Sequence, residues 1–547
     1  MNLWQRSTQA LGALPARRVT WVLAIVFSLW AVADMAYFKV SSGLAQNSYD
    51  AMVRARLYAP PADPRILIID IDEASLSRMA GEFGRWPWPR DTLATVLDYV
   101  EKQAPAAVVW DVLFADPDRL SPGGDKAFDE AAKRSAHSHF PVVRLPAAND
   151  GKSKLSRSNL PNLWLPSTDA AVNQSTQTLA VIPPFLASIA NSRLGYNNGY
   201  PDSDGVLRRY RYVERLPGGG VIQSIPVSVA RSLNTAQMQN TSNLIAEDDA
   251  FTPTVGKKIL KDKLMVWRKN ANAYPRVAFA DVFNAAEGGK PLKTLPDFKG
   301  KIIVIGSTAP SLHDIHPTPL APAQAGVDSL ATAIDNAVNG HFVAELPRWL
   351  QAGLAVLMCV LLAYWVSGFQ GGKGLASLDP ALLILPAALL AISFASLNGT
   401  PLFVDLQLAA GTALLFLAAL RTWNGWRRDH WCGYSPTPEA LIGVHASQPL
   451  AGVGLDRLIG MLAKYAPACR VVAGDASATW PASLRWSELA RFCAVCGPTQ
   501  QLAALAQAPW PDGTQFGATQ ILANLPADNP QRSAHIAQAA VRACAAL

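Results

Sequence analysis

Four long apolar runs interrupt an otherwise mixed sequence of hydrophobic and polar positions. Each run is close to the ~20 residues that an α-helix needs to cross the hydrocarbon core of a membrane. The last three runs fall within residues 349–420, a stretch that contains only three charged residues. The pattern therefore predicts four transmembrane helices, at residues 19–38, 349–369, 381–397 and 402–420.

Basic residues beside these runs predict the orientation of the chain. They lie before the first run, between the second and third, and after the fourth: Arg17, Arg18, Lys373, Arg421, Arg427 and Arg428. Lysine and arginine accumulate on the cytoplasmic side, and four crossings return the chain to the side where it started. We therefore expect a cytoplasmic N-terminus at residues 1–18, an outer domain at residues 39–346 and a cytoplasmic domain at residues 421–547.

Cysteine usage agrees with this topology. All six cysteines follow residue 358, so the outer domain has none and must be held together by its core instead of disulfides. A multi-pass protein of the bacterial inner membrane with a periplasmic domain fits best. One alternative stays open for the first run, which could be a signal peptide cleaved after Ala33, although its length is enough for an anchor.

Short apolar segments within residues 39–346 alternate with amphipathic ones. Residues 65–72, 106–111 and 301–306 are nearly continuous apolar runs, as is typical of parallel strands that are buried on both faces. Residues 125–135 and 326–339 have the apolar spacing of helices. Strands that alternate with helices predict an α/β domain with a largely parallel sheet.

Composition narrows the function classes. Half of the chain is hydrophobic and 16% is charged, which excludes intrinsic disorder. The net charge of +7 is explained by the basic residues that flank the membrane runs, so we expect no nucleic acid as a partner. The chain contains no Walker loop, G-x-S-x-G, H-E-x-x-H or G-x-G-x-x-G motif, and we predict no enzyme activity for the outer domain and no cofactor.

Several charged residues in the outer domain end predicted strands or follow them. The carboxyl ends of strands border the ligand crevice in open α/β sheets. The sequence therefore predicts a polar ligand pocket, and the candidate residues are Asp72, Glu73, Arg90, Asp111 and Asp204. The alternative is that these residues cap helices and form structural ion pairs.

Two further segments resemble metal sites only weakly. Residues 201–205 begin like a calcium loop but are better explained as a turn before a strand at residues 206–213. His313, Asp314 and His316 have no clear further ligand, so no metal is predicted.

In this order along the chain, several motifs resemble the second class of CHASE domains, which are extracytoplasmic sensory modules of bacterial signalling proteins. The motifs are Ile69-Asp-Ile-Asp-Glu73, Trp86-Pro-Trp-Pro-Arg90, Val109-Trp-Asp111, Asp202-Ser-Asp-Gly-Val206 with Arg208-Arg209, Ile305-Gly-Ser-Thr-Ala309, Asp314 with Thr318-Pro319, and Gly326-Val327. The resemblance covers about residues 40–345 and implies a sensor that passes a periplasmic signal inward. It implies no particular ligand.

The C-terminal region, residues 421–547, is expected to form a small α/β or α+β domain. Its pair Cys493 and Cys496 lacks the context of a redox or zinc site, which favours two cysteines on or near a packed helix. Our first hypothesis is a non-enzymatic sensor or receptor, embedded in the lipid bilayer, that binds a periplasmic ligand or protein and docks a cytoplasmic or membrane signalling partner. A homodimer would suit it. The alternatives are a membrane-bound enzyme with a divergent nucleotidyl-cyclase-like tail and an envelope scaffold that senses nothing.

Overall fold

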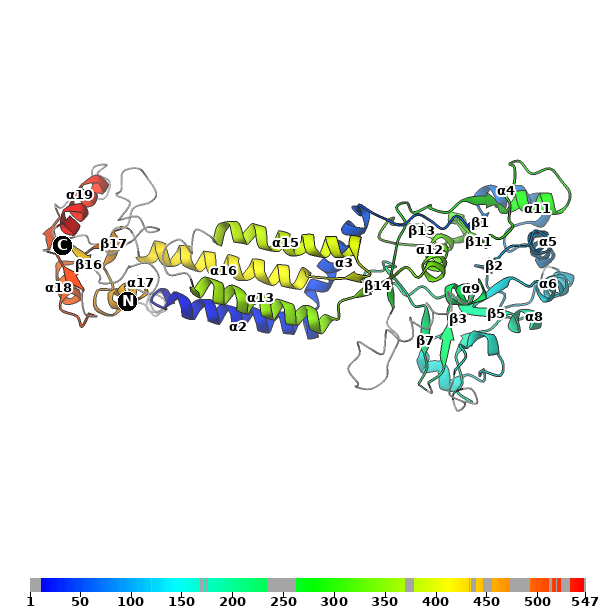
Figure 1. The fold of residues 1–547 in the computed structure, drawn as a ribbon, viewed down its shortest axis with the longest axis horizontal. Helices are drawn as coiled ribbons and strands as arrows, with labels where there is room; N and C mark the ends of the chain where they lie inside the picture. The colour runs from blue at the N-terminus through cyan, green and yellow to red at the C-terminus, as the bar shows by residue number, and fades with distance from the viewer. Residues whose placement is uncertain are drawn as a thin grey trace. The chain divides into compact units, whose positions relative to one another are not determined.

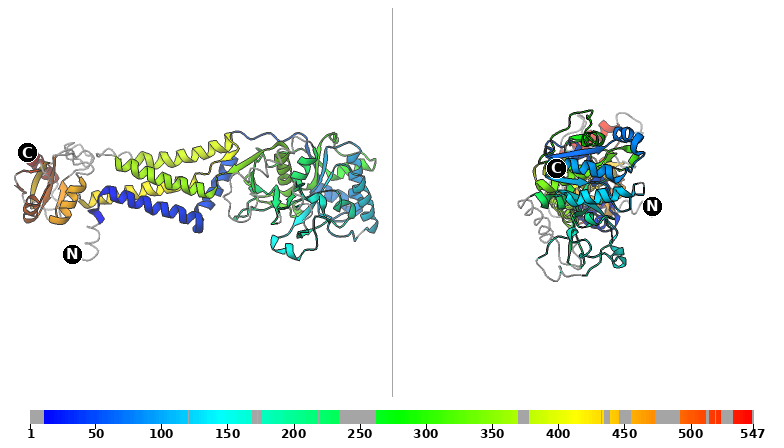
Figure 2. Two further views of the ribbon diagram at one scale, coloured as in Figure 1. Left: turned by 60° about the horizontal axis from the view of Figure 1, so that its bottom comes forward. Right: turned by 90° about the vertical axis from the view of Figure 1, so that its right-hand side faces the viewer.

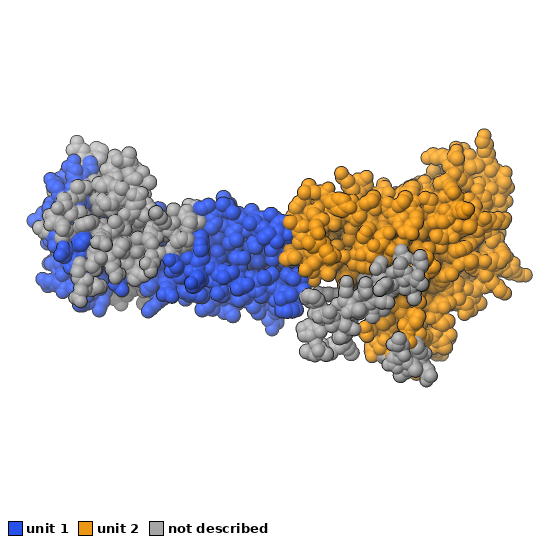
Figure 3. All heavy atoms as spheres, viewed as in Figure 1, with its two compact units in different colours: residues 1–45, 346–393, 405–547 blue, residues 46–345, 394–404 orange. Residues whose placement is uncertain are grey.

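The structure, a computed structural model, describes residues 11–119, 121–167, 172, 176–217, 219–233, 262–368, 378–431, 433, 439–445, 455–472, 492–510, 514–517, 519–522 and 532–545. The chain divides into two compact units, coloured separately in Figure 3. Unit 1 comprises residues 1–45, 346–393 and 405–547, and unit 2 comprises residues 46–345 and 394–404.

Unit 2 is built around a largely parallel sheet. Its strands are β1 (Ile66–Ile71), β2 (Ala107–Trp110), β3 (Ser138–Arg144), β4 (Val181–Ile182), β5 (Arg193–Tyr196), β10 (Arg276–Ala278) and β11 (Ile302–Ser307). They follow the order β10-β1-β11-β2-β3-β4, with β5 also paired to β3, and only the pairing of β4 is antiparallel. The predicted parallel α/β sheet is therefore confirmed.

Helices cover both faces of this sheet (Figures 1 and 2). One face holds α4 (Glu73–Phe83), α5 (Arg90–Glu101), α6 (Pro122–Arg134), α8 (Ala187–Ala190) and α11 (Phe279–Ala286), and the other holds α9 (Ile225–Leu233) and α12 (Gly326–Asn339). Successive residues of a strand point to opposite faces, so Leu67 and Ile69 join one core while Ile66 and Ile68 join the other. This two-sided burial explains the continuous apolar runs in the sequence.

A second, smaller sheet of unit 2 combines distant parts of the chain. Its strands are β6 (Arg209–Tyr210), β9 (Lys263–Met265), β14 (Phe342–Glu345) and β15 (Leu402–Phe403), in the order β15-β14-β9-β6. The ring of Phe403 packs edge-on against Tyr49 of helix α3 (Val40–Arg54), with 5.3 Å between centroids. Two hairpins, β7 (Val213–Arg215) with β8 (Val221–Gln223) and β12 (Ile315–His316) with β13 (Gln324–Ala325), complete the unit.

Three helices in the described part of the chain are long and apolar enough to cross a membrane: Ala16–Phe38, Arg348–Gly368 and Pro380–Gly399. They coincide with the first three predicted spans. The first consists of α2 (Ala16–Ala33) and its continuation through Phe38, and the others are α13 (Arg348–Gly368) and α15 (Leu378–Gly399).

The fourth predicted span, residues 402–420, differs from the helix that the structure contains. Leu402 and Phe403 form strand β15, and helix α16 extends from Gln407 to Trp431. The helix continues past the apolar run into a segment with three arginines, because a helix end is not set by hydrophobicity alone. A fourth membrane crossing therefore stays a prediction.

The C-terminal part of unit 1 is a small α/β domain. Its elements are β16 (Ala440–His445), α17 (Leu455–Tyr465), β17 (Arg470–Val472), β18 (Phe492–Gly497), α18 (Thr499–Ala506), β19 (Gln515–Phe516), β20 (Gln520–Ile521) and α19 (Arg532–Ala545). The antiparallel order β17-β18-β16-β19, with helices after the first and third strands, is the split βαβ arrangement of ferredoxin-like folds. Helices α17 and α18 pack on one face of the sheet and α19 on the other.

The prediction for Cys493 and Cys496 was right only in part. Both cysteines lie on strand β18, whose two faces are buried by helices, so they are near packed helices but not on one. The predicted strand at residues 206–213 is broken into β6 and β7, which belong to different sheets: β6 pairs with β9, and β7 pairs with β8.

Candidate functional site

The carboxyl ends of strands β1, β11 and β2 lie side by side, as predicted. Two of the candidate residues there lie at the start of helix α4. Asp72 is the N-cap of α4, where its carboxylate accepts a hydrogen bond of 2.7 Å from the Ser75 amide. Glu73 is exposed and accepts a hydrogen bond of 2.9 Å from the Ser311 amide, which lowers the pKa of this carboxyl. Both carboxylates therefore stabilise the local fold.

Asp70, the residue before this turn, is more deeply buried. Its carboxylate accepts a 2.8 Å hydrogen bond from the Thr308 hydroxyl and lies 3.4 Å from the Arg276 guanidinium. Arg276 also donates to Asp328 at 2.8 Å. Burial raises the pKa of Asp70, and it raises that of Asp328 to about 6. One arginine thus holds two buried carboxyl groups on the sheet's edge.

Asp111 follows β2 and differs from the other acids because part of its carboxylate lacks a partner. Oδ1 accepts a 2.6 Å hydrogen bond from Asn197, but Oδ2 is buried without a partner among the described residues. Burial, and secondly the nearby charge of Asp314, raise the pKa of Asp111 to about 7. Asp314 itself forms a 3.4 Å ion pair with His316, and this partner raises the pKa of that imidazole.

Gly306 allows this acid to sit at the strand end. A Cβ atom on Gly306 would lie 2.9 Å from Cβ of Asp111 and 2.8 Å from a methyl group of Val327. Real Cβ atoms are not found at such distances, so the close approach of β11, β2 and α12 requires glycine at this position.

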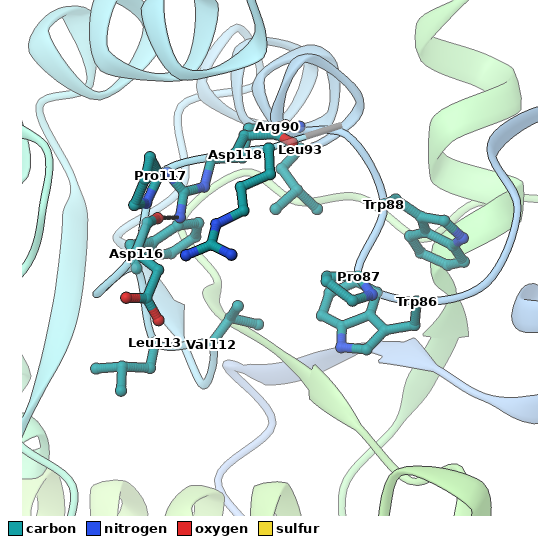
Figure 4. A pocket seen from close by; sticks show the side chains of 12 residues that line it. Trp86, Pro87, Trp88, Arg90, Leu93, Val112, Leu113, Asp116, Pro117 and Asp118 are labelled. Carbon is teal, nitrogen blue, oxygen red and sulfur yellow. Dashed lines mark hydrogen bonds between the residues drawn. The ribbon is translucent and has the colours of Figure 1, made fainter. Parts of the chain in front are cut away.

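Arg90 lies at a cavity of about 550 Å³ beside the Trp-Pro-Trp-Pro-Arg segment (Figure 4). The lining combines apolar residues, among them Trp86, Trp88 and Leu93, with charged ones, and its exposed surface is more polar than apolar. The Arg90 guanidinium forms an ion pair with Asp125, donates to the Asp116 carbonyl and lies 5.6 Å from the centre of the Phe114 ring. A cavity of this size and lining is of the kind that binds small molecules.

Asp204 belongs to a separate ion-pair network, which we call the arginine cluster. It consists of Arg208, Arg209, Asp50, Asp202, Asp204 and Glu345. The side chain of Arg208 is only 1% exposed. It makes two 2.7 Å hydrogen bonds to Asp50 and further hydrogen bonds to Asp204 at 2.7 and 2.9 Å.

The second arginine of the cluster extends it to another strand. Arg209 donates two hydrogen bonds to Glu345 on β14, at 2.6 and 2.7 Å, and also pairs with Asp202. Paired bonds of this kind fix orientation as well as charge. The hydrogen bonds to the carboxylates raise the pKa of both guanidinium groups, against the effect of burial.

The five predicted site residues therefore do not share one pocket. Arg90 lines the cavity, Asp111 is half-buried near Asp314, and Asp204 joins the arginine cluster. Asp72 caps helix α4, and Glu73 accepts a hydrogen bond from Ser311. The reason is that the sheet order inserts β11 between β1 and β2, which separates the two strand ends.

The remaining polar candidates have structural partners. Within the described residues, no group of three or more His, Cys, Asp or Glu side chains is arranged to hold a metal ion. His139 is buried between the hydroxyls of Ser228 and Ser232, at 2.9 and 3.1 Å, and burial lowers its pKa to about 3. It is a neutral core residue.

Sequence reasoning missed most partners in the arginine cluster. Arg208 and Asp50 are 158 positions apart, and nothing in the sequence near either residue indicates the contact. The adjacent pair Arg208-Arg209 after an acidic turn is the one local signal. Two neighbouring arginines require acidic partners if they are buried.

Comparison with known families agrees with this geometry. The family model described as the CHASE2 domain matches residues 21–366, which include both the sheet of unit 2 and the first two apolar helices. No curated protein and no solved structure matched the chain. CHASE2 domains are sensory extracellular domains, and the match covers more than half of the chain. The chain therefore belongs to the CHASE2 domain family.

Proposed function

We propose that this protein is a receptor of the bacterial inner membrane that detects a periplasmic ligand or protein and relays the signal to a cytoplasmic or membrane partner. In this proposal α2, α13, α15 and α16 cross the lipid bilayer, and both termini lie in the cytoplasm. The sensory family of residues 21–366 and the three apolar helices support it.

The arginine cluster is the single observation that best supports a relay. Arg208 binds Asp50 on α3, the helix that follows the first apolar helix in the chain. Arg209 binds Glu345 on β14, three residues before α13 begins at Arg348. One turn of the sensory domain therefore holds the segment by which the chain enters it and the segment by which the chain leaves it.

The C-terminal domain has a comparable connection within unit 1. Asp456 of α17 pairs with Arg427 of α16 at 2.6 Å and accepts a 2.9 Å hydrogen bond from the amide of Ala16, the first residue of α2. Arg427 also donates to the Gly12 carbonyl at 3.2 Å. Displacement of α2 or α16 would act directly on α17, so the domain suits an output or docking role.

Relay requires two states that bind the signal with different affinity. A shift in the arginine cluster would change how α3 and β14 are held and would pass along α2 and α13. Ion pairs suit this task. Removal of one partner from a buried pair costs about 3–5 kcal/mol, so arrangements with an unpaired charge are unfavourable and the cluster changes from one complete set of pairs to another. A homodimer is compatible with the proposal but is not required by it.

The test uses the full chain in lipid nanodiscs and compares Arg208→Lys with the wild type by hydrogen exchange. Lysine keeps the charge but loses the paired hydrogen bonds to Asp50. We expect faster exchange both in α3 and in α17. The matched control is Arg134→Lys, since the Arg134 side chain is 58% exposed and its ion pair with Asp98 lies on the surface of unit 2. An effect of Arg208→Lys confined to α3 would favour the scaffold interpretation over the receptor.

An enzymatic tail is the second candidate. The split βαβ order of the C-terminal domain is compatible with a divergent nucleotidyl-cyclase-like domain, but a fold of this type hosts many unrelated functions. The described strand β16 has the sequence Ala-Leu-Ile-Gly-Val-His and contains no carboxylate for a metal-bound nucleotide. We therefore favour docking over catalysis.

A further inference from the structure

The cavity beside Trp86 combines an apolar body with a polar end. Apolar side chains of Leu93, Val112 and Leu113 line it together with the Trp-Pro-Trp segment. Leu113 is 40% exposed at this cavity of about 550 Å³. Apolar surface of this kind is stabilised when a ligand covers it.

Both signs of charge meet at the polar end. Figure 4 shows the Arg90 guanidinium directed into the open space, with the Asp116 side chain on the same side and Trp86 and Pro87 on the opposite side. Arg90 uses one nitrogen for Asp125 and another for the Asp116 carbonyl, and a guanidinium has five N–H donors. Donors therefore remain for a further acceptor.

Asp116 supplies the complementary acceptor. Its backbone carbonyl binds Arg90, whereas its carboxylate forms no hydrogen bond or ion pair among the described residues. The neighbouring acids have fixed partners: Asp118 accepts hydrogen bonds from the amides of Arg90 and Ser121 at 2.9 and 3.0 Å, and Asp125 pairs with Arg90. Asp116 is thus the carboxylate at this end that is available to a ligand.

Arg119 also lines the cavity, so the lining carries a second guanidinium beside Arg90 and the Asp116 carboxylate. A ligand with one charge meets a group of like sign among them. An anion that reaches Arg90 would also meet the Asp116 carboxylate, and a cation that reaches Asp116 would meet the Arg90 guanidinium. A ligand that presents an acid and an ammonium group together satisfies both. Its remaining part must be apolar and large enough to cover Trp86 and Leu113.

We propose that this cavity binds zwitterionic small molecules of the amino-acid class with a large apolar side chain. The acid group pairs with the spare N–H donors of Arg90, the ammonium group pairs with Asp116, and the side chain lies against Trp86 and Val112. This inference rests on the proposed receptor function and gives the chemical class of its ligand.

The test measures binding to the full chain in lipid nanodiscs by calorimetry, with empty nanodiscs as the blank. Three probes share one ring and differ in charge: L-phenylalanine, phenethylamine without the acid group, and 3-phenylpropionate without the amine. L-Phenylalanine is expected to bind at least about tenfold more tightly than either single-charge probe, because each lost charged hydrogen bond is a large fraction of such a site's affinity.

A variant identifies the site. Asp116→Asn should weaken L-phenylalanine about tenfold, since the ammonium contact is lost, and should not weaken 3-phenylpropionate, since the carboxylate that repels this anion is removed. Asp116 is exposed, so this change leaves the fold intact. The control Asp297→Asn alters another exposed aspartate, which is outside the cavity lining, and should change neither probe.

Three results would overturn the proposal: equal binding of a single-charge probe, no saturable binding of L-phenylalanine at millimolar concentration, or an Asp116→Asn variant that binds L-phenylalanine like the wild type. Its failure can be distinguished from failure of the receptor function. If Arg208→Lys does not speed hydrogen exchange in α17, the relay is refuted even when L-phenylalanine binds. Conversely, faster exchange in α17 supports the relay even when L-phenylalanine does not bind.

Discussion

Replacement of Asp111 by asparagine should stabilise the sensory domain in a pH-dependent way. Burial and the charge of Asp314 raise the pKa of Asp111 from its ordinary value of 3.8 to about 7 in the folded protein. The folded state therefore keeps this proton at pH values where the unfolded state has lost it. Between these two values stability falls as pH rises, because the folded state binds more protons than the unfolded state.

The size of the effect follows from the difference between the two pKa values. About three units at 1.36 kcal/mol each set an upper limit of about 4 kcal/mol for the destabilisation above pH 7. Asp111 is half-buried as a residue, so solvent screening should reduce this to on the order of 2 kcal/mol. An asparagine can still accept the hydrogen bond from Asn197 and has no charge to desolvate.

The assay is hydrogen exchange of β2 and β11 in the full chain, corrected for the intrinsic effect of pH on exchange. The Asp111 amide donates a 2.8 Å hydrogen bond to the Ile305 carbonyl, so its protection reports local opening at this site. Asp111→Asn should show greater protection than the wild type above pH 7, and the difference should vanish as pH falls toward 4. The control Asp98→Asn changes an exposed carboxylate on α5 and should show no such difference. Equal protection of Asp111→Asn and wild type above pH 7 would refute the reasoning.

Other predictions concern packing, buried charge and the tail. Gly306→Ala should destabilise unit 2 by about 1–3 kcal/mol, because the new Cβ atom would lie 2.8 Å from a methyl group of Val327. The control Gly81→Ala should be neutral or stabilising, because a Cβ atom there has no other atom within 4 Å. Thermal unfolding of the two variants measures the difference. Arg268→Met should cost about 3–5 kcal/mol by denaturant unfolding, because it leaves Asp335, 1% exposed, without its guanidinium partner; a stable variant would contradict this. Calorimetry of the full chain with ATP and GTP should show no saturable binding, and a saturable signal would favour the enzymatic tail.

The sequence was most informative where burial is two-sided. Strands β1 and β11 were predictable from continuous apolar runs, and helix α12 was predicted with the same bounds that the structure has. The resemblance to the CHASE2 family was also confirmed. In these segments the burial of the side chains follows a regular period along the strand or helix, so the local hydrophobic pattern is enough to predict the element.

The site was much less predictable, because its contacts join residues that are far apart in the chain. Asp111 depends on Asn197, which is 86 positions away, and the arginine cluster joins Arg209 to Glu345 across 136 positions. The expectation that strand-end acids converge on one pocket omitted the strand that lies between them. Composition could not indicate that order, since β1, β2 and β11 are all nearly continuous apolar runs.

The short strand β15 has a consequence for how the sensory domain can be isolated. A fragment that ends at Glu345 lacks residues 394–404 of unit 2, which are the end of α15 and strand β15. Strand β14 would then lose its parallel neighbour and become an open sheet edge, and Tyr49 would lose the Phe403 ring that covers it. Unprotected edges recruit strands from other molecules. Such a fragment is expected to aggregate, and fusing residues 394–404 after Glu345 through a flexible linker should restore a monodisperse domain.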